Sequence, residues 1–132
     1  MAKAKRVKQL SFTIPNKTGL LSEITTAVAG TKANISAICA YEQDKRAYFL
    51  LITDGNAKAR KPLDKLKIKT KEEEVVLVEM PNKIGELQKV SEKIADAGVN
   101  INYMYGTTGT GRSSVCVFKT SDNKKAISVI NK

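Results

Sequence analysis

An internal repeat constrains the fold of this chain more than any other feature. The sequence IPNKTGLL at residues 14–21 returns as MPNKIGEL at residues 80–87, which is 66 residues later. The same offset places the Asn-Ile pair at 34–35 on a second Asn-Ile pair at 100–101. Self-similarity at a fixed period indicates units that share one fold. The sequence therefore predicts two similar units in tandem.

Each unit carries the same order of hydrophobic patterns. Leu10, Phe12 and Ile14 alternate with polar residues, which predicts a half-buried strand. Leu21, Ile24 and Val28 then form one face of an expected helix. The remaining elements of the first unit are expected as strands at 34–41 and 46–53, a short helix at 57–65 and a strand at 66–70. The second unit repeats the pattern with strands at 76–80, 100–105 and 112–119 and helices at 87–94 and 124–130.

This β-α-β-β-α-β order predicts an α+β fold, in which two helices cover one face of a four-stranded antiparallel, ferredoxin-like sheet. The expected first unit is residues 1–70 with a basic N-terminus, and the second is residues 71–132. The chain ends before a fourth strand of the second unit, so residues 75–80 are expected to form an edge covered by a partner chain or the other unit.

The third strand of the first unit is apolar on both faces, which favours further assembly. Tyr48, Leu50 and Ile52 alternate with Phe49 and Leu51 along this strand. A second layer is therefore expected over it, and we expect a homo-oligomer, at least a dimer.

Composition excludes several function classes. The chain of 132 residues has no His and two Cys, so His-based nucleophile pairs and metal sites are excluded. We find no catalytic constellation and expect no enzyme activity, no metal and no cofactor. No apolar stretch approaches the length of a membrane span, and two cysteines without a pairing framework favour the cytoplasm.

The net charge of +10 raises the possibility of an anionic partner. Residues 1–70 carry 14 basic and 5 acidic side chains, whereas residues 71–132 carry 9 and 8. RNA binding through the basic first half is therefore an alternative function on this fold. The third strands lack the Gly- and aromatic-rich signature of RNA recognition motifs, which makes nucleic acid an unlikely partner.

The repeated Pro-Asn-Lys-X-Gly-X-Leu turn lies between a strand and a helix, where free backbone N–H groups and the positive end of the helix dipole attract anions. Gly19 and Gly85 leave room for a carboxylate beside these groups. Asn16 and Asn82 are candidates to cap the helix or to accept a hydrogen bond from a ligand ammonium group.

The duplicated turn, followed 18 residues after its Asn by another Asn and Ile, resembles the ACT domain family over nearly the whole chain. In that family the first strand ends in a Pro-Asp/Asn-X-X-Gly-X-Leu turn, and the second strand begins with a Gly-Val/Ile-Asn-Ile-like segment. The resemblance implies ligand contacts at Asn16, Thr18, Gly19, Leu20, Asn34 and Ile35 in the first unit and at Asn82, Ile84, Gly85, Glu86, Asn100 and Ile101 in the second. For Asn34 and Asn100, a local turn at the strand entry is the alternative role.

The resemblance also implies a function. Such domains are regulatory modules that bind small ligands, typically amino acids, at interfaces between paired domains. We therefore expect a non-enzymatic, amino-acid-binding regulatory protein that acts allosterically in amino-acid metabolism, with an unidentified regulated enzyme as its partner. Glu86 replaces Leu20 and Gly98 replaces Lys32, so the two sites are expected to differ in affinity.

Overall fold

The computed structural model describes residues 1–108 and 111–132. Contacts among these residues divide the chain into two compact units. The first unit is residues 8–73, and the second unit is residues 1–7 together with residues 74–132. The expected division placed residues 1–7 in the first unit, so this part of the boundary differs from the expectation.

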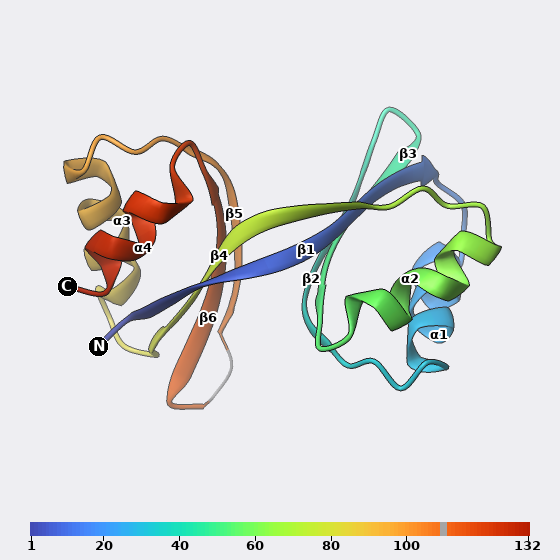
Figure 1. Ribbon diagram of the computed structural model, residues 1–132, viewed down its shortest axis with the longest axis horizontal. Coiled ribbons are helices and arrows are strands. Elements are labelled where there is room, and N and C mark those ends of the chain that lie inside the picture. The colour runs from blue at the N-terminus through green and yellow to red at the C-terminus, as the bar shows by residue number, and fades with distance from the viewer. Residues whose placement is uncertain (109–110) are drawn as a thin grey trace. The chain divides into compact units, whose positions relative to one another are not determined.

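The first unit has strand order β2-β3-β1-β4 with two helices on one face (Figure 1). Its elements are β1 (Lys3–Pro15), α1 (Leu20–Ala29), β2 (Ile35–Gln43), β3 (Arg46–Thr53), α2 (Asn56–Lys65) and the start of β4 (Lys71–Pro81).

The second unit has strand order β1-β4-β6-β5, also with two helices on one face. Besides the start of β1 and most of β4, it contains α3 (Glu86–Asp96), β5 (Ile101–Thr108), β6 (Ser113–Thr120) and α4 (Asn123–Ile130). The α+β class with ferredoxin-like units is confirmed. Within the described residues, none of the helices is long and apolar enough to cross a bilayer.

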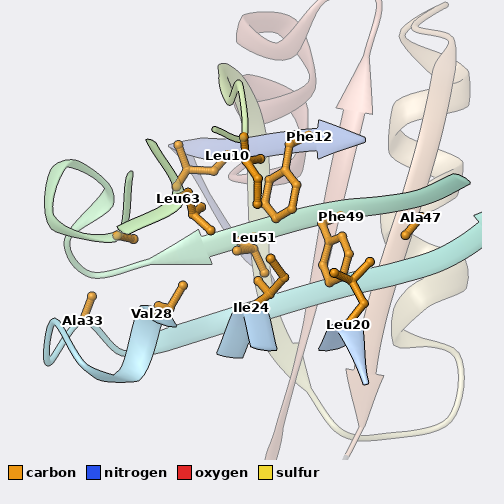
Figure 2. Close-up of a cluster of buried hydrophobic side chains, with 12 residues drawn as sticks. Leu10, Phe12, Leu20, Ile24, Val28, Ala33, Ala47, Phe49, Leu51 and Leu63 are labelled. Atoms are coloured by element: carbon orange, nitrogen blue, oxygen red, sulfur yellow. The ribbon is translucent and has the colours of Figure 1, made fainter. Parts of the chain in front are cut away.

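Each unit has its own hydrophobic core between the sheet and the helices. In the first unit, Leu20, Ile24 and Val28 of α1 face the strands, where the rings of Phe12 and Phe49 stack with centroids 4.9 Å apart (Figure 2). Leu20 rather than Leu21 belongs to the buried stripe, because the buried positions of α1 follow an i, i+4, i+8 spacing. Leu21 is consequently 52% exposed, beside the turn.

The second unit does have a fourth strand, contrary to the sequence prediction. The first residues of β1 belong to this unit and lie next to β4, so β4 is not an open edge there. Ala4 packs into the second core, and the Asn131 side chain binds its backbone through Oδ1 to the N–H (2.7 Å) and Nδ2 to the carbonyl (2.9 Å). The missing strand therefore comes from the N-terminus of the same chain.

The first unit also takes its fourth strand from the start of a strand that lies mostly in the other unit, in this case β4. Residues 66–70, expected as its fourth strand, form a turn and an irregular segment that lies outside the described strands, although Ile68 is buried in the first core. The strand begins at Lys71, and residues 71–73 of β4 lie beside β1 in this unit. Each unit thus uses the start of the other unit's first strand.

Each unit contains a Thr-Asn pair that holds the backbone at the residue where β1 or β4 enters that unit. The Thr53 hydroxyl donates to Asn56 Oδ1 (2.6 Å), and Asn56 Nδ2 donates to the Lys8 carbonyl (3.1 Å). In the second unit, the Thr120 hydroxyl donates to Asn123 Oδ1 (2.7 Å), and Asn123 Nδ2 donates to the Glu74 carbonyl (2.9 Å). The repeat therefore extends to hydrogen bonds that the sequence comparison did not identify.

The second hairpin is one residue longer than the first. Ile14 pairs with Ala47 in the first unit, whereas its counterpart Met80 pairs with Ser114, which lies 67 residues after Ala47. The offset of 66 therefore changes to 67 after the second strand of each unit. The strand expected at residues 112–119 therefore begins one residue later, at Ser113, which corresponds to Arg46.

Candidate functional site

Both repeated turns have the same backbone conformation. Gly19 and Gly85 adopt left-handed conformations, each with φ 84°, immediately before α1 and α3. Residues with a Cβ adopt this region at a cost of about 1–2 kcal/mol, whereas glycine does so freely. Nothing lies within 4 Å of the position that a Cβ would take at Gly19. Glycine is thus required by the backbone conformation at this position, not by crowding from neighbouring atoms of the chain.

Two N–H groups remain free at the start of each of these helices. In the first unit, the Leu20 N–H binds the Lys17 carbonyl (3.2 Å) and the Glu23 N–H binds the Gly19 carbonyl (3.0 Å). The N–H groups of Leu21 and Ser22 have no acceptor within the described part of the chain. In the second unit, the N–H groups of Leu87 and Gln88 likewise have no acceptor among the described residues. These groups and the helix dipole make each turn electropositive.

The two asparagines of the turns do not cap the helices, contrary to one sequence expectation. Asn16 Nδ2 donates to Glu42 Oε2 (2.9 Å), and the Asn16 N–H donates to the Lys45 carbonyl (2.9 Å). Asn82 donates through Nδ2 to the Gly111 carbonyl (3.2 Å) and through its N–H to the Arg112 carbonyl (2.8 Å). The left-handed glycine turns the chain away from a capping geometry, so both asparagines instead hold the turn against the neighbouring hairpin.

A hollow of about 320 Å³ adjoins the turn of the first unit. It contains charges of both signs, because the Lys17 ammonium, which is 3.0 Å from Glu23, lies on the turn and the Glu42 carboxylate lies on β2. The rest of the lining is mostly apolar and comes from Leu20, Leu21, Ala40, Tyr41, Ala47 and Phe49. Lys17, Tyr41 and Glu42 were not identified from the sequence.

The turn of the second unit carries a different charge. Glu86 occupies the first position of α3, its side chain is 15% exposed, and its Oε1 is 3.5 Å from Lys89 Nζ. A carboxylate in the first helical turn interacts favourably with the helix dipole and repels an external anion. Ile84 of this turn is fully exposed, and the corresponding Thr18 in the first unit is also exposed. The first turn of α1 also carries a carboxylate, Glu23, which pairs with Lys17 at 3.0 Å.

The asparagines at the start of the second strands lie away from these turns. The Asn34 N–H binds Asp54 Oδ1 (2.8 Å), and the Asp54 N–H binds the Asn34 carbonyl (3.1 Å). Asn100 makes the equivalent pair of bonds with Ser121. Ile35 and Glu42 lie near opposite ends of β2, about 23 Å apart at 3.3 Å per residue.

Because of this separation, the ligand contacts that the family resemblance implies fall into two groups within each unit. The turn residues form one group, and the residues at the start of β2 or β5 form the other. A single small ligand cannot contact both groups inside one unit. The backbones of Asn34 and Asn100 take part in the local turn that was the alternative expectation.

No cluster of three or more His, Cys, Asp or Glu side chains that could hold a metal occurs within the described residues. Cys39 is half-buried and Cys116 is buried, and burial raises the pKa of both thiols. A raised pKa lowers the thiolate fraction, so these cysteines are poor nucleophiles near neutral pH.

Comparison with solved structures finds similar proteins. Protein BT0572 from Bacteroides thetaiotaomicron is 32% identical, with a TM-score of 0.87, and the match covers 97% of this chain and 88% of that one. The ligand-free regulatory subunit of aspartate kinase from Thermus thermophilus matches at 16% identity and a TM-score of 0.68, over 98% and 94% of the two chains. The corresponding Thermus flavus subunit matches at 15% identity and a TM-score of 0.62, over 99% and 94%.

No curated protein matched this sequence. The two Thermus structures share the fold at low identity. The family model described as an ACT domain pair matches residues 5–132, which is nearly the whole chain. The chain therefore belongs to the ACT domain pair family.

Proposed function

We propose that this chain is a non-catalytic regulatory protein that binds a free amino acid at the turn of the first unit. The observation that carries the proposal is the pairing of opposite charges around one hollow. The free N–H groups of Leu21 and Ser22 and the Lys17 ammonium attract a carboxylate, while the Glu42 carboxylate attracts an ammonium group. An α-amino acid carries both groups on one carbon.

Each part of the ligand has a complementary surface. The α-carboxylate binds at the N-terminal end of α1, and the α-ammonium group binds Glu42, whose other interaction with Asn16 fixes its position. The ligand's side chain lies against Leu20, Leu21 and Ala40, of which Leu21 is 52% exposed. Because this wall is apolar, we propose an amino acid with an uncharged side chain.

The comparisons support an amino-acid ligand. Two structures of the same fold are regulatory subunits of aspartate kinase, and aspartokinase III of E. coli, 16% identical over 31% of its own length, was crystallised with lysine and aspartate. By analogy, we propose that this chain regulates an enzyme of amino-acid metabolism. The second turn, which contains Asn82, Gly85 and Glu86, is a weaker site in this proposal.

Regulation requires that the ligand favour one of two arrangements of the protein. A coupling free energy of about 1–3 kcal/mol is typical of such systems, and it comes from the difference in ligand affinity between the two arrangements. We propose that the chain assembles at least to a dimer and that its assembly changes with ligand. Light scattering with and without ligand measures this change, and a monodisperse monomer in both cases would contradict it.

A thermal-shift screen against the twenty amino acids tests the binding. A ligand at about 100 times its Kd stabilises the folded protein by about 2.7 kcal/mol. The Glu42→Gln variant keeps an acceptor for Asn16 Nδ2 but removes the charge, so we expect it to abolish the shift. Glu92→Gln, an exposed position on α3, is the matched control and is expected to retain it. Equal shifts in both variants, or no shift with any amino acid, would exclude this site.

A further inference from the structure

The first unit has a second hollow, on the face of its sheet opposite the helices. Phe12 and Phe49 face the helices, so Ser11, Tyr48 and Leu50 face the other way. The hollow measures about 380 Å³. It extends from Tyr41 on β2, across β3 and β1, to Lys71 at the start of β4 and Lys69 just before it. Tyr41 lines both hollows, whereas Asn16, Lys17 and Glu42 of the amino-acid site do not line this one.

Tyr41 presents an aromatic surface at one end of this hollow. Tyr41 and Tyr48 are directly opposite each other on β2 and β3, and their rings stack with centroids 5.1 Å apart and planes at 10°. β2 is the edge strand of this unit, and Tyr41 is 49% exposed. Tyr48 therefore covers one side of the Tyr41 ring, and the other side is available for stacking.

Unpaired cations lie at the other end. Lys69 and Lys71 are exposed, and within the described part of the chain neither has an ion-pair partner. Arg46 lies on the same face, and its guanidinium donates to the Thr13 carbonyl (3.1 Å). The one carboxylate in the lining is Glu73, which accepts a hydrogen bond from the Ser11 hydroxyl (2.6 Å). The charge around the hollow is therefore positive.

We propose that this face binds single-stranded nucleic acid, with a base stacked on Tyr41 and phosphates at Lys69 and Lys71. Aromatic stacking and cationic tracking of the backbone together bind unpaired strands without a sequence-reading motif. This mode of binding does not require the signature of RNA recognition motifs, which β3 lacks. A second copy of this chain fits less well, because it would bring further positive charge to the same face.

Fluorescence anisotropy with a labelled oligouridine of about 12 nucleotides, within the usual range of site sizes, tests the proposal. The test variant is Lys69→Gln/Lys71→Gln. Lys124→Gln/Lys125→Gln, on α4, removes the same charge from exposed positions elsewhere. For single strands, each phosphate contact contributes about 0.7 to the slope of log Kd against log salt. We expect the test variant to lose about 0.7 per lysine and the control to keep the full slope.

The aromatic contact has a separate test. Tyr41→Leu retains an apolar side chain but removes the ring, and we expect it to weaken binding about 5- to 150-fold, the range for loss of one stacked base. Circular dichroism verifies that the variant is folded. A duplex of the same length is expected to bind more weakly than the single strand. Equal effects of the two lysine pairs, equal or tighter duplex binding, or no binding near 50 mM salt would each overturn the proposal.

Discussion

Replacing Asn131 by alanine removes both hydrogen bonds that hold Ala4 of β1 to the end of α4. The bonds measure 2.7 Å at the Ala4 N–H and 2.9 Å at its carbonyl, and Ala4 is 8% exposed. A typical hydrogen bond contributes about 0.5–1.5 kcal/mol, so two bonds give a loss of about 1–3 kcal/mol in the free energy of unfolding. The loss is expected in the second unit, because Ala4 packs in that core.

Urea unfolding measures this loss as a lower midpoint with an unchanged m-value. Asn131→Asp keeps the acceptor for the Ala4 N–H and loses the donor to its carbonyl, so we expect an intermediate value. Asn102→Ala, at an exposed position of β5, is the control for the substitution itself and is expected to change stability by no more than about 0.5 kcal/mol. If Asn131→Ala were as stable as the control, the N-terminal strand would not contribute to the second unit as described.

Three further predictions follow from backbone conformation and burial. Gly19→Ala is expected to destabilise the first unit by about 1–2 kcal/mol in urea unfolding, because alanine is strained at φ 84°. Wild-type stability in this variant would contradict the left-handed turn. Lys32→Gly is expected to stabilise the protein by about 0.5–1 kcal/mol, because Lys32 has φ 67° where the second unit has glycine; a loss of stability would count against that conformation. Burial raises the pKa of Cys39 and Cys116, so iodoacetamide is expected to modify both more slowly than a free thiol near pH 8 and faster as the pH rises. The same raised pKa makes their contribution to folding stability fall as the pH rises through the titration range of the thiols. Rapid, pH-independent modification of either cysteine would refute this reasoning.

The sequence predicted most elements because their hydrophobic periods are local. Alternation identified β1, and the positions of Ile24 and Val28 identified α1. The predictions for the fourth strand of each unit were wrong for a physical reason. Ala4 lies among basic residues, and a strand so polar gives no periodic signal until it is paired with a distant strand. The reciprocal use of β1 and β4 is a tertiary feature that repeat length alone does not reveal.

The candidate site was predicted only in part. The left-handed Gly19 and the free N–H groups beside it follow from a glycine between a strand and a helix. Glu42 and Tyr41 lie more than 20 residues further along the sequence, and only the fold brings them to the turn. Asn34 follows the same helix from its other end, so antiparallel packing places it far from Asn16. Motif spacing does not contain that information.

The most direct test of amino-acid binding is a titration followed by ¹⁵N NMR of the backbone amides. The amino acid that gives the largest thermal shift is added to the wild-type protein and to Glu42→Gln. We expect the amide resonances of Leu21 and Ser22 to move in the wild-type protein, and to move far less in the variant, because these N–H groups are free to donate hydrogen bonds to the ligand's carboxylate. Unchanged resonances at Leu21 and Ser22, with shifts confined to other parts of the chain, would contradict binding at this turn.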